Sequence, residues 1–350
     1  MPSNRDLNPS NFPKPTVVST FSGAGGSCLG YEQAGYDVVW ANEFVPAAAA
    51  TYAANHPDTI LDTHDIRTVT PGHILSATGL DPGDIDLFDG SPPCASFSTG
   101  GARSANWGKV KKYSDTKQRT DDLFDEYIRL LRGLQPKTFV AENVPGLARG
   151  PAVGYFKHVH AELQACGYRV QAQVLDACRL GVPQARRRII FVGVRQDLNI
   201  APPHPTPGPR VPMSTVLGPK AVLWVNNPRN KNATWDRIPA TRPCPTVQAV
   251  GIHGRAIPQV CLTGVTPMDL DPEVGTTLHL TYANLLAEHP HPTDARLFTI
   301  TELKQLCGFP VDYRLTGTYA QRWERLGRAV PPPMMRAVAA TLKGAVLSAA

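Results

Sequence analysis

The chain has 350 residues, of which 42% are hydrophobic and 18% charged, so it can bury a sizeable core and global disorder is excluded. Its net charge of +6 is compatible with a nucleic-acid partner, and no apolar stretch approaches the ~20 residues that a membrane helix needs. The seven cysteines include no Cys-x-x-Cys pair, which is typical of a reduced intracellular protein without a zinc site. The polar residues 1–15 are expected to form a loose leader.

Short apolar runs alternate with helical patterns from Thr16 to about Arg195. The strands predicted from these runs are 16–21, 37–41, 85–88, 137–142, 168–177 and 188–194. The predicted helices follow the glycine turn after the first strand, as far as Ala34, and then cover 46–55, 121–134 and 152–166. This alternation predicts an α/β fold with a mainly parallel, doubly wound sheet.

The composition changes after this region. Seven prolines lie between Ala201 and Pro219, which indicates a linker or an irregular lobe. From 220 to about 297 the sequence shows short β-like pieces and many turn residues, and helices are predicted again over 301–307 and after the prolines at 331–333. The predicted division is therefore a main domain over 16–196 and 298–350, interrupted by a separate region over 197–297.

The ends of the first two predicted strands carry a nucleotide-type pattern. The first strand leads into Phe21-Ser-Gly-Ala-Gly-Gly26, where glycines allow a tight turn and close approach of the backbone to a ligand. The second ends in Asn42-Glu43, about twenty residues on, where an acid suits a ribose diol. A plain turn and a solvated acid are the alternatives, and the spacing favours a cofactor.

Three further groups follow later strands. Pro92 and Pro93 stiffen the backbone before Cys94, and the alternative to a reactive thiol is an inert buried cysteine. Glu142 ends the fourth strand as a plausible acid–base partner or, alternatively, as a surface glutamate. Strand alternation would put Arg186 and Arg188 on one face and Arg187 on the other, although arginine clusters are commonly solvated.

Taken in order, these pieces resemble the blocks of the DNA cytosine-5 methyltransferases. The matching blocks are Phe21-x-Gly-x-Gly, Asn42-Glu43, Pro-Pro-Cys94-x-x-Phe-Ser, Glu142-Asn-Val, Gln184-x-Arg-x-Arg188, Arg242-Pro-x-x-Thr246 and Gly327-x-Ala-Val-Pro-Pro332. The segment that starts at Phe298 is also similar to the family, and the match covers 16–196 and 240–342. The resemblance implies a Rossmann-like S-adenosylmethionine-dependent methyltransferase sheet with a smaller, irregular or β-rich target-recognition domain over 197–297.

The resemblance also implies a mechanism on a cytosine flipped out of the duplex. Cys94 would add to C6 of the ring so that C5 accepts the methyl group, and Glu142 would supply a proton or hydrogen bond at N3. Arg188 would bind the cytosine O2, and Arg186 would hold a phosphate or the catalytic loop. Residues 101–120 carry six Lys or Arg and one Asp, so this loop would close on DNA phosphates.

The family pattern further predicts the donor site. The donor-binding residues that it implies are Phe21, Gly23, Gly25, Gly26, Glu43, Phe44, Asp65, Ile66, Asp89, Pro92, Arg328 and Ala329. No metal is expected. The expected partner is double-stranded DNA, without a membrane, and the chain is expected to be a monomer. A bacterial or phage-encoded protein of the cytoplasm, on the nucleoid when it binds DNA, fits this description.

Two positions depart from the family pattern. Ala95 follows the nucleophile where glutamine is usual, and Arg328 stands where asparagine is usual. A guanidinium at ~6 Å from a sulfonium is repulsive by about 3 kcal/mol at an effective dielectric constant of ~20. Arg328 would therefore turn to solvent, pair with the methionine carboxylate of an ordinary donor, or pair with the extra carboxylate of carboxy-S-adenosylmethionine. The last case would make the protein a DNA cytosine carboxymethyltransferase.

Two other function classes stay open at this point. One is a non-catalytic DNA-binding relative, although Cys94, Glu142 and Arg188 are all retained. The other is an RNA cytosine methyltransferase on the same fold, for which no RNA-binding module is visible. The recognition sequence and the biological role are not specified by any motif.

Overall fold

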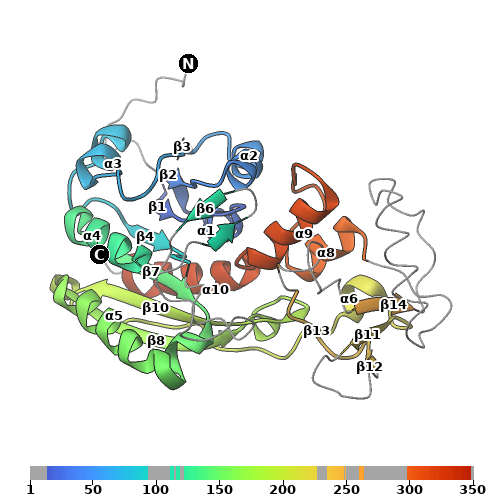
Figure 1. Cartoon of the computed structure of the whole chain (residues 1–350). Helices are drawn as coiled ribbons and strands as arrows, with labels where there is room; N and C mark the ends of the chain where they lie inside the picture. Colours follow the sequence, from blue (N-terminus) through green and yellow to red (C-terminus); the bar gives the residue numbers. More distant parts are fainter. Residues whose placement is uncertain are drawn as a thin grey trace. The chain divides into compact units, whose positions relative to one another are not determined.

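The computed structural model describes residues 14–93, 111–113, 116–118, 122–226, 235–247, 249, 260–263 and 298–347 (Figure 1). The chain forms two compact units. The first comprises Met1–Asp176, Arg187–Pro207 and Pro332–Ala350, and the second comprises Ala177–Arg186 and Gly208–Pro331. Residues 298–331 thus belong to the second unit, whereas the sequence placed them with the main domain.

A seven-stranded sheet in the order β3-β2-β1-β4-β7-β10-β8 is the centre of the first unit. Its strands are β1 (Thr16–Thr20), β2 (Asp37–Asn42), β3 (Ile60–Asp62), β4 (Leu87–Gly90), β7 (Thr138–Asn143), β8 (Tyr168–Asp176) and β10 (Arg187–Arg195). The pairs from β3 to β7 are parallel, and β10 is antiparallel to both of its neighbours. The predicted mainly parallel α/β sheet is confirmed, with six strands placed to within two residues.

The helices of the first unit cover both faces of this sheet. They are α1 (Gly26–Gln33), α2 (Pro46–Asn55), α3 (Pro71–Thr78), α4 (Leu123–Leu134), α5 (Val153–Ala165) and α10 (Pro332–Leu342), with a last turn at Lys343–Leu347. Short 3-10 turns lie at Pro145–Ala148, Gly150–Ala152 and Gln196–Leu198, and β5 (Lys111–Tyr113) pairs with β6 (Thr116–Gln118). Strand β3 and helix α3, which are three and eight residues long, were not predicted from the sequence.

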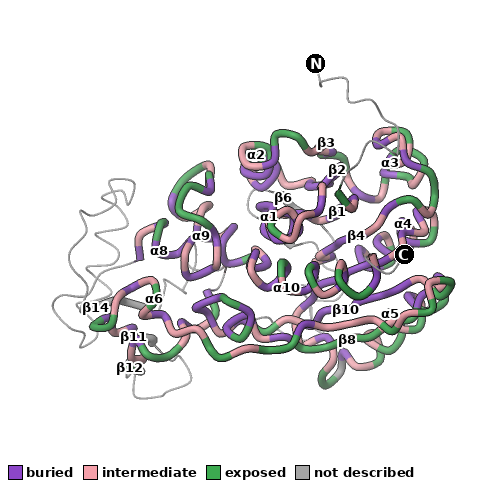
Figure 2. Tube along the Cα trace, turned by 180° about the vertical axis from the view of Figure 1, so that it is seen from behind, coloured by how far each residue is buried: buried purple, intermediate pink, exposed green. Residues whose placement is uncertain are grey.

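An aromatic core lies beneath helices α3, α4 and α5. The ring of Tyr127 on α4 stacks on Phe88 at 4.7 Å and meets Phe139 edge-on at 6.3 Å, and Phe139 in turn meets Tyr168 at 5.1 Å. The Tyr127 hydroxyl donates to the backbone oxygens of Phe88 and Val140. Figure 2 shows the central strands buried, whereas the edge strand β8 carries mostly intermediate and exposed residues.

The other face of the sheet is covered by α1 and α10, which come from opposite ends of the sequence. Gly30 of α1 lies so close to α10 that an added Cβ would meet the backbone oxygen of Pro332 at 2.6 Å. The Tyr36 hydroxyl donates to the backbone oxygen of Ala339 at 3.1 Å, and the Lys343 ammonium donates to the backbone oxygen of Gly35 at 3.0 Å. No helix in the described part of the chain combines the length and the apolar character needed to cross a membrane.

The second unit combines short strands with helices. Its elements are β9 (Gln184–Ala185), α6 (Ser214–Leu217), β11 (Val222–Asn226), β12 (Trp235–Pro239), β13 (Cys244–Pro245), β14 (Val260–Thr263), α8 (Ile300–Leu306) and α9 (Tyr319–Arg328), with a 3-10 turn at Ala177–Arg179. Strands β12, β11 and β14 form an antiparallel sheet, and β9 pairs with β13. The short β-strands expected between 220 and 297 are therefore present among the described residues.

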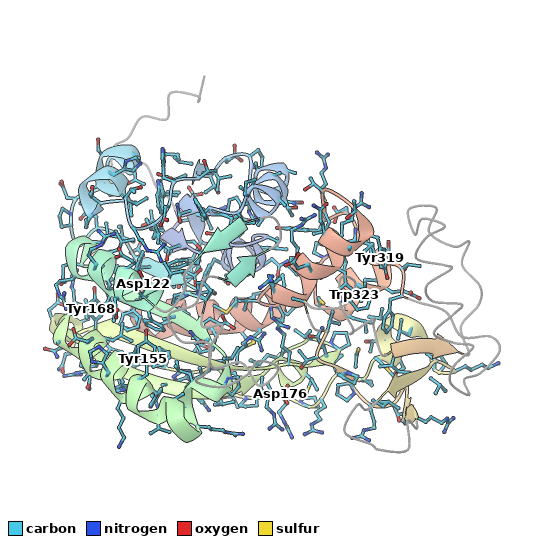
Figure 3. All side chains as sticks on the ribbon, viewed as in Figure 1. Asp122, Tyr155, Tyr168, Asp176, Tyr319 and Trp323 are labelled. Carbon is cyan, nitrogen blue, oxygen red and sulfur yellow. The ribbon has the colours of Figure 1, made fainter. Side chains whose placement is uncertain are left out.

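Helix α9 was not predicted, because half of its residues are charged or polar. Thr318 and Gln321 form a capping box at its start, and Tyr319 and Trp323 turn its apolar side inward (Figure 3). Their rings are 6.0 Å apart, and the Tyr319 hydroxyl donates to the backbone oxygen of Phe298 at 2.7 Å. The segment at Phe298 is thus fixed to α9 within this unit.

The packing of β10 on the aromatic core gives a stability prediction. Gly193 lies opposite Phe139 in the sheet, and a Cβ at Gly193 would overlap the Phe139 ring. Because Tyr127 and Tyr168 hold that ring, Gly193→Ala should lower the free energy of unfolding by about 1–3 kcal/mol, measured by urea unfolding. Gly154→Ala at the exposed start of α5 is the control, since its Cβ would meet nothing within 4 Å. Equal stabilities for the two variants would contradict the packing.

Candidate active site

The glycine turn after β1 is built from left-handed backbone. Phe21 has a φ of 53°, Gly23 of 57° and Gly25 of 82°, and Gly25 starts helix α1. A Cβ at Gly23 would meet no atom within 4 Å, so the main chain there is open to a ligand. The N–H of Ser22 donates to the backbone oxygen of Asn42 at 3.0 Å, which ties the turn to the end of β2. The turn therefore offers a cradle of backbone at a helix N-terminus.

Glu43 lies directly beside this turn and is only 8% exposed. Its carboxylate accepts the N–H of Gly23 and the N–H of Val45, each at 2.7 Å. It is therefore a fixed acid rather than a solvated one. Phe44 next to it is half-buried.

Asp65 and Ile66 follow β3. The Asp65 carboxylate accepts the backbone N–H of Arg67 at 3.0 Å and pairs with its guanidinium at 3.2 Å. Arg67 also pairs with Asp122 at 2.8 Å, the residue labelled in Figure 3 at the start of α4. Ile66 is 4% exposed and belongs to the core, so its side chain packs inward. Only Asp65 of this pair keeps a half-exposed side chain.

Asp89 on β4 is almost completely enclosed, at 1% exposure. The Tyr31 hydroxyl donates to Oδ1 at 2.6 Å and the Ser19 hydroxyl to Oδ2 at 2.9 Å. Burial raises the pKa of this carboxyl to about 7, although both hydrogen bonds oppose the shift. The Asp89 side chain, which was predicted to bind the methyl donor, thus accepts hydrogen bonds from two hydroxyls of the protein.

The chain beyond β4 is anchored to β7. The Asn143 amide donates to the backbone oxygen of Pro92 at 3.2 Å, and its own Oδ1 accepts the N–H of Val144 at 2.8 Å. Cys94 lies outside the described residues, as does most of the predicted basic loop over 101–120. Asn143 was missed as a site residue, although the Glu142-Asn-Val block contained the signal.

Glu142 and Arg188 are brought together at the ends of β7 and β10. Arg188 Nε lies 2.6 Å from Glu142 Oε1, and the two side chains are 14% and 10% exposed. The guanidinium also donates to the backbone oxygen of Arg187 at 2.7 Å, so both its position and that of the carboxylate are fixed. Arg187 itself is 61% exposed and pairs with Asp176, labelled in Figure 3, at 3.6 Å.

Arg186 belongs to the second unit and is 2% exposed. Its guanidinium donates to the backbone oxygens of Val247 and Arg328 at 3.3 and 3.2 Å. These carbonyls accept from the guanidinium that was expected to hold a phosphate or the catalytic loop. Sequence reasoning did not foresee this, because an arginine within a run of three is normally solvated.

Arg328 ends helix α9 and turns to its own helix. Its guanidinium pairs with Glu324 one turn earlier at 2.7 Å, and the side chain is 36% exposed. This i,i+4 pair is the common arrangement of a surface helix. Ala329 follows as the C-terminal cap, and its N–H donates to the backbone oxygen of Arg325 at 2.9 Å. The described residues contain no group of three or more His, Cys, Asp or Glu arranged to hold a metal ion.

Three comparisons with known proteins bear on this arrangement. The type II methyltransferase M.XorII of Xanthomonas oryzae pv. oryzae is 29% identical over 93% of this chain and 84% of its own length. M.AgeI of Thalassovita gelatinovora is 36% identical, but the match spans 54% of this chain and 42% of that protein. The Dnmt2 methyltransferase of S. pombe shares the fold, with a TM-score of 0.60 and 18% identity over 95% of this chain and 99% of that one.

The family model described as C-5 cytosine-specific DNA methylase matches residues 16–344, which is nearly the whole chain. The match includes the glycine turn, Glu43, the Glu142–Arg188 pair and helix α9, and it spans both compact units. The chain therefore belongs to the C-5 cytosine-specific DNA methylase family.

Proposed function

We propose that this protein transfers the methyl group of S-adenosylmethionine to C5 of a flipped cytosine in double-stranded DNA. The observation that carries the proposal is the fixed Glu142–Arg188 pair, which lies at the sheet edge where Asn143 anchors the chain toward Cys94. Membership of the methylase family supports the same chemistry. A duplex substrate requires the base to leave the stack before it reaches these groups.

Cys94 acts as the nucleophile in this proposal. Its thiolate adds to C6 of the cytosine, and the electron pair of the C5–C6 double bond becomes available at C5. This carbon bonds the methyl group as the bond between the methyl group and the donor sulfur breaks. Transfer of the C5 proton to a solvent water then restores the double bond and expels the thiolate. Five other cysteines are buried in the described part of the chain, namely Cys28, Cys166, Cys178, Cys244 and Cys307. Burial raises the pKa of the Cys28 thiol to about 12, so it is an inert alternative.

Glu142 supports the addition step at the opposite side of the ring. Negative charge builds on the pyrimidine as the thiolate adds, and a carboxyl group at N3 supplies the proton or hydrogen bond that stabilises it. Arg188 holds Glu142 in one orientation and has further donors for the cytosine O2. Such preorganisation means that little rearrangement is needed when the charge develops.

The open backbone at Gly23 and the buried carboxylate of Glu43 fit an adenosyl donor. Glu43 would hold the ribose hydroxyls, and the glycine turn would approach the donor closely. Asp65 would lie beside the adenine base of the donor. The donor supplies an electrophilic methyl group. The Arg328–Glu324 pair gives no support to a carboxylated donor, so ordinary S-adenosylmethionine is proposed.

The first prediction concerns the nucleophile. Duplex DNA incubated with the protein and an equal mixture of both donors should yield 5-methylcytosine, measured by mass spectrometry of nucleosides. Cys94→Ser should abolish the product, because the hydroxyl does not form the C6 adduct, and it should leave folding and DNA binding intact. Cys261→Ser in β14 is the matched control and should keep its activity.

DNA that carries 5-fluorocytosine should trap the wild type covalently, since fluorine is not eliminated. An adduct that persists in Cys94→Ser would place the nucleophile elsewhere. A product of 5-carboxymethylcytosine would favour the carboxylated donor, and activity on transfer RNA alone would overturn the DNA substrate. A protein that binds DNA but forms neither adduct nor product would be a non-catalytic relative.

The acid gives the second prediction of this site. Glu142→Gln should lower turnover by about 10²–10⁴-fold, because the amide keeps the shape but delivers no proton. Arg188→Gln should also lower turnover, since Glu142 loses the partner that orients it at 2.6 Å. Arg187→Gln, the exposed neighbour, is the control and should stay within about threefold of the wild type. The steady-state methylation rates of the wild type and the three variants are compared on one DNA duplex. A fully active Glu142→Gln would exclude Glu142 as the proton or hydrogen-bond donor.

Recognition of the DNA sequence is proposed for the region between the two segments of the predicted main domain, 16–196 and 298–350. Residues up to Pro207 belong to the first unit, so exchange of 208–297 for the matching region of a relative leaves the sheet intact. The exchange should change which DNA sequence is methylated without changing the product, because base-edge contacts determine the sequence that is recognised. Bisulfite sequencing of DNA that has been incubated with the protein measures which sequences are methylated. An unchanged preference would assign recognition to another part of the chain.

A further inference from the structure

One buried acid near the glycine turn is not used by the proposed mechanism. Asp89 lies on β4 at 1% exposure, between the turn after β1 and the strand that carries Glu142. The titratable groups that act on it or respond to it are Tyr31 and Cys28 of α1, Tyr127 of α4 and Glu142 of β7. Each is either neutral or acidic, so ionisation of Asp89 is supported by hydroxyl hydrogen bonds rather than by a cation.

A chain of hydroxyls connects Asp89 to the glycine turn. Ser22 lies between Phe21 and Gly23, and its Oγ is 3.0 Å from the Ser19 Oγ. Ser19 in turn donates to Asp89 Oδ2 at 2.9 Å. A carboxylate only accepts hydrogen bonds, so its charge obliges Ser19 to donate to it and leaves the Ser19 oxygen free to accept from Ser22. The charge thus sets the direction of the whole chain.

Protonation of Asp89 disturbs this order. A neutral carboxyl carries one hydrogen, and when that hydrogen is on Oδ2 it points at the Ser19 oxygen. Ser19 then no longer donates to Asp89, and its own hydrogen turns toward another acceptor. The hydroxyl contact between Ser19 and Ser22 then has no fixed direction, and the Ser22 hydroxyl has an alternative acceptor in the backbone oxygen of Ser19 at 3.3 Å. The turn that it belongs to contains the left-handed residues Phe21 and Gly23, and such backbone persists only where its surroundings hold it.

We infer that Asp89 is a positioning residue for the methyl donor: its ionised carboxylate holds the glycine turn, through Ser19 and Ser22, in the conformation that binds S-adenosylmethionine. The inference rests on the proposed function, because it assigns the donor to this turn. Protonation of Asp89 therefore weakens donor binding. Since burial raises the pKa of Asp89 to about 7, the change falls within the physiological pH range.

If the role of Asp89 were purely structural, the quantity that depends on pH would be the stability of the fold, and it would change in the direction opposite to that of the donor affinity. An acid with a raised pKa in the folded state stabilises the fold most when protonated, and that stability is lost as the pH rises through about 7. Donor affinity, in contrast, should increase over the same range. A donor affinity that rises with pH while the stability of the fold falls thus distinguishes a positioning role of Asp89 from a purely structural one.

The test is isothermal titration calorimetry of S-adenosylmethionine against the full chain between about pH 6 and pH 8, with thermal unfolding in the same buffers. One linked proton gives at most a tenfold change per pH unit. The wild-type affinity should therefore rise about tenfold across the range, with a midpoint near 7. Asp89→Asn should lose this rise and bind as weakly as the wild type at low pH. Titration of the donor amino group, with a pKa of about 8, would occur equally in both proteins.

Two further variants make the result specific. Tyr31→Phe removes a hydrogen bond that favours the ionised carboxylate, so it should move the midpoint to higher pH while keeping the rise. Asp86→Asn is the matched control, because Asp86 lies three residues earlier, pairs with Lys137 at 2.8 Å and bonds to Thr16. It should keep the wild-type pH dependence even if it destabilises the fold.

S-adenosylhomocysteine, which lacks the sulfonium charge, should show the same rise as the donor. A rise with the donor alone would mean that the Asp89 charge acts directly on the sulfonium, and the positioning role would be wrong. An unchanged rise in Asp89→Asn, or tight binding with no rise in the wild type, would overturn this inference and leave the proposed function standing. Absence of donor binding at every pH would overturn both.

Discussion

The parallel arrangement of β2, β1, β4 and β7 is the constraint on which the rest of the first unit depends. Parallel neighbours end at the same edge of a sheet, so residues that follow different strands meet there although they are far apart in sequence. The glycine turn, Glu43, Pro92 and Glu142 all lie at such strand ends. The site is therefore a consequence of strand direction, and the loops add groups to positions that the sheet has already fixed.

The residues that sequence reasoning placed correctly are those whose local pattern is unambiguous. Strands such as β7 and β10 are continuous apolar runs, and Glu142 was identified because it ends one of them. The glycine turn was visible for the same reason. The partners of these residues were not predictable, because Tyr31 and Asp89 are 58 positions apart and nothing in either segment indicates the other. Asn143 shows an intermediate case, since its block was recognised but its bond to Pro92 needed the fold.

The three consecutive arginines show why residue type alone is a poor guide to role. Arg186 is buried on backbone carbonyls, Arg187 is exposed beside Asp176, and Arg188 holds Glu142. The charge is the same for all three and strand alternation separates only Arg187 from the other two, so the surroundings decide the different roles of Arg186 and Arg188. A guanidinium has five donors, so a buried one is stable wherever enough acceptors converge, whether these are carboxylates or main-chain oxygens. The local sequence does not record which acceptors will converge.

The pairing of α1 with α10 has a consequence for how the protein is made. The hydrogen bond from Tyr36 to Ala339 spans 303 positions, so the face of the sheet that α1 and α10 cover is completed only after α10 has been synthesised. Contacts of such long range are also slow to form, because the entropy of closing the intervening chain is lost before the contact is gained. A nascent chain that already contains Glu142 and Arg188 therefore still lacks the helix that packs against α1.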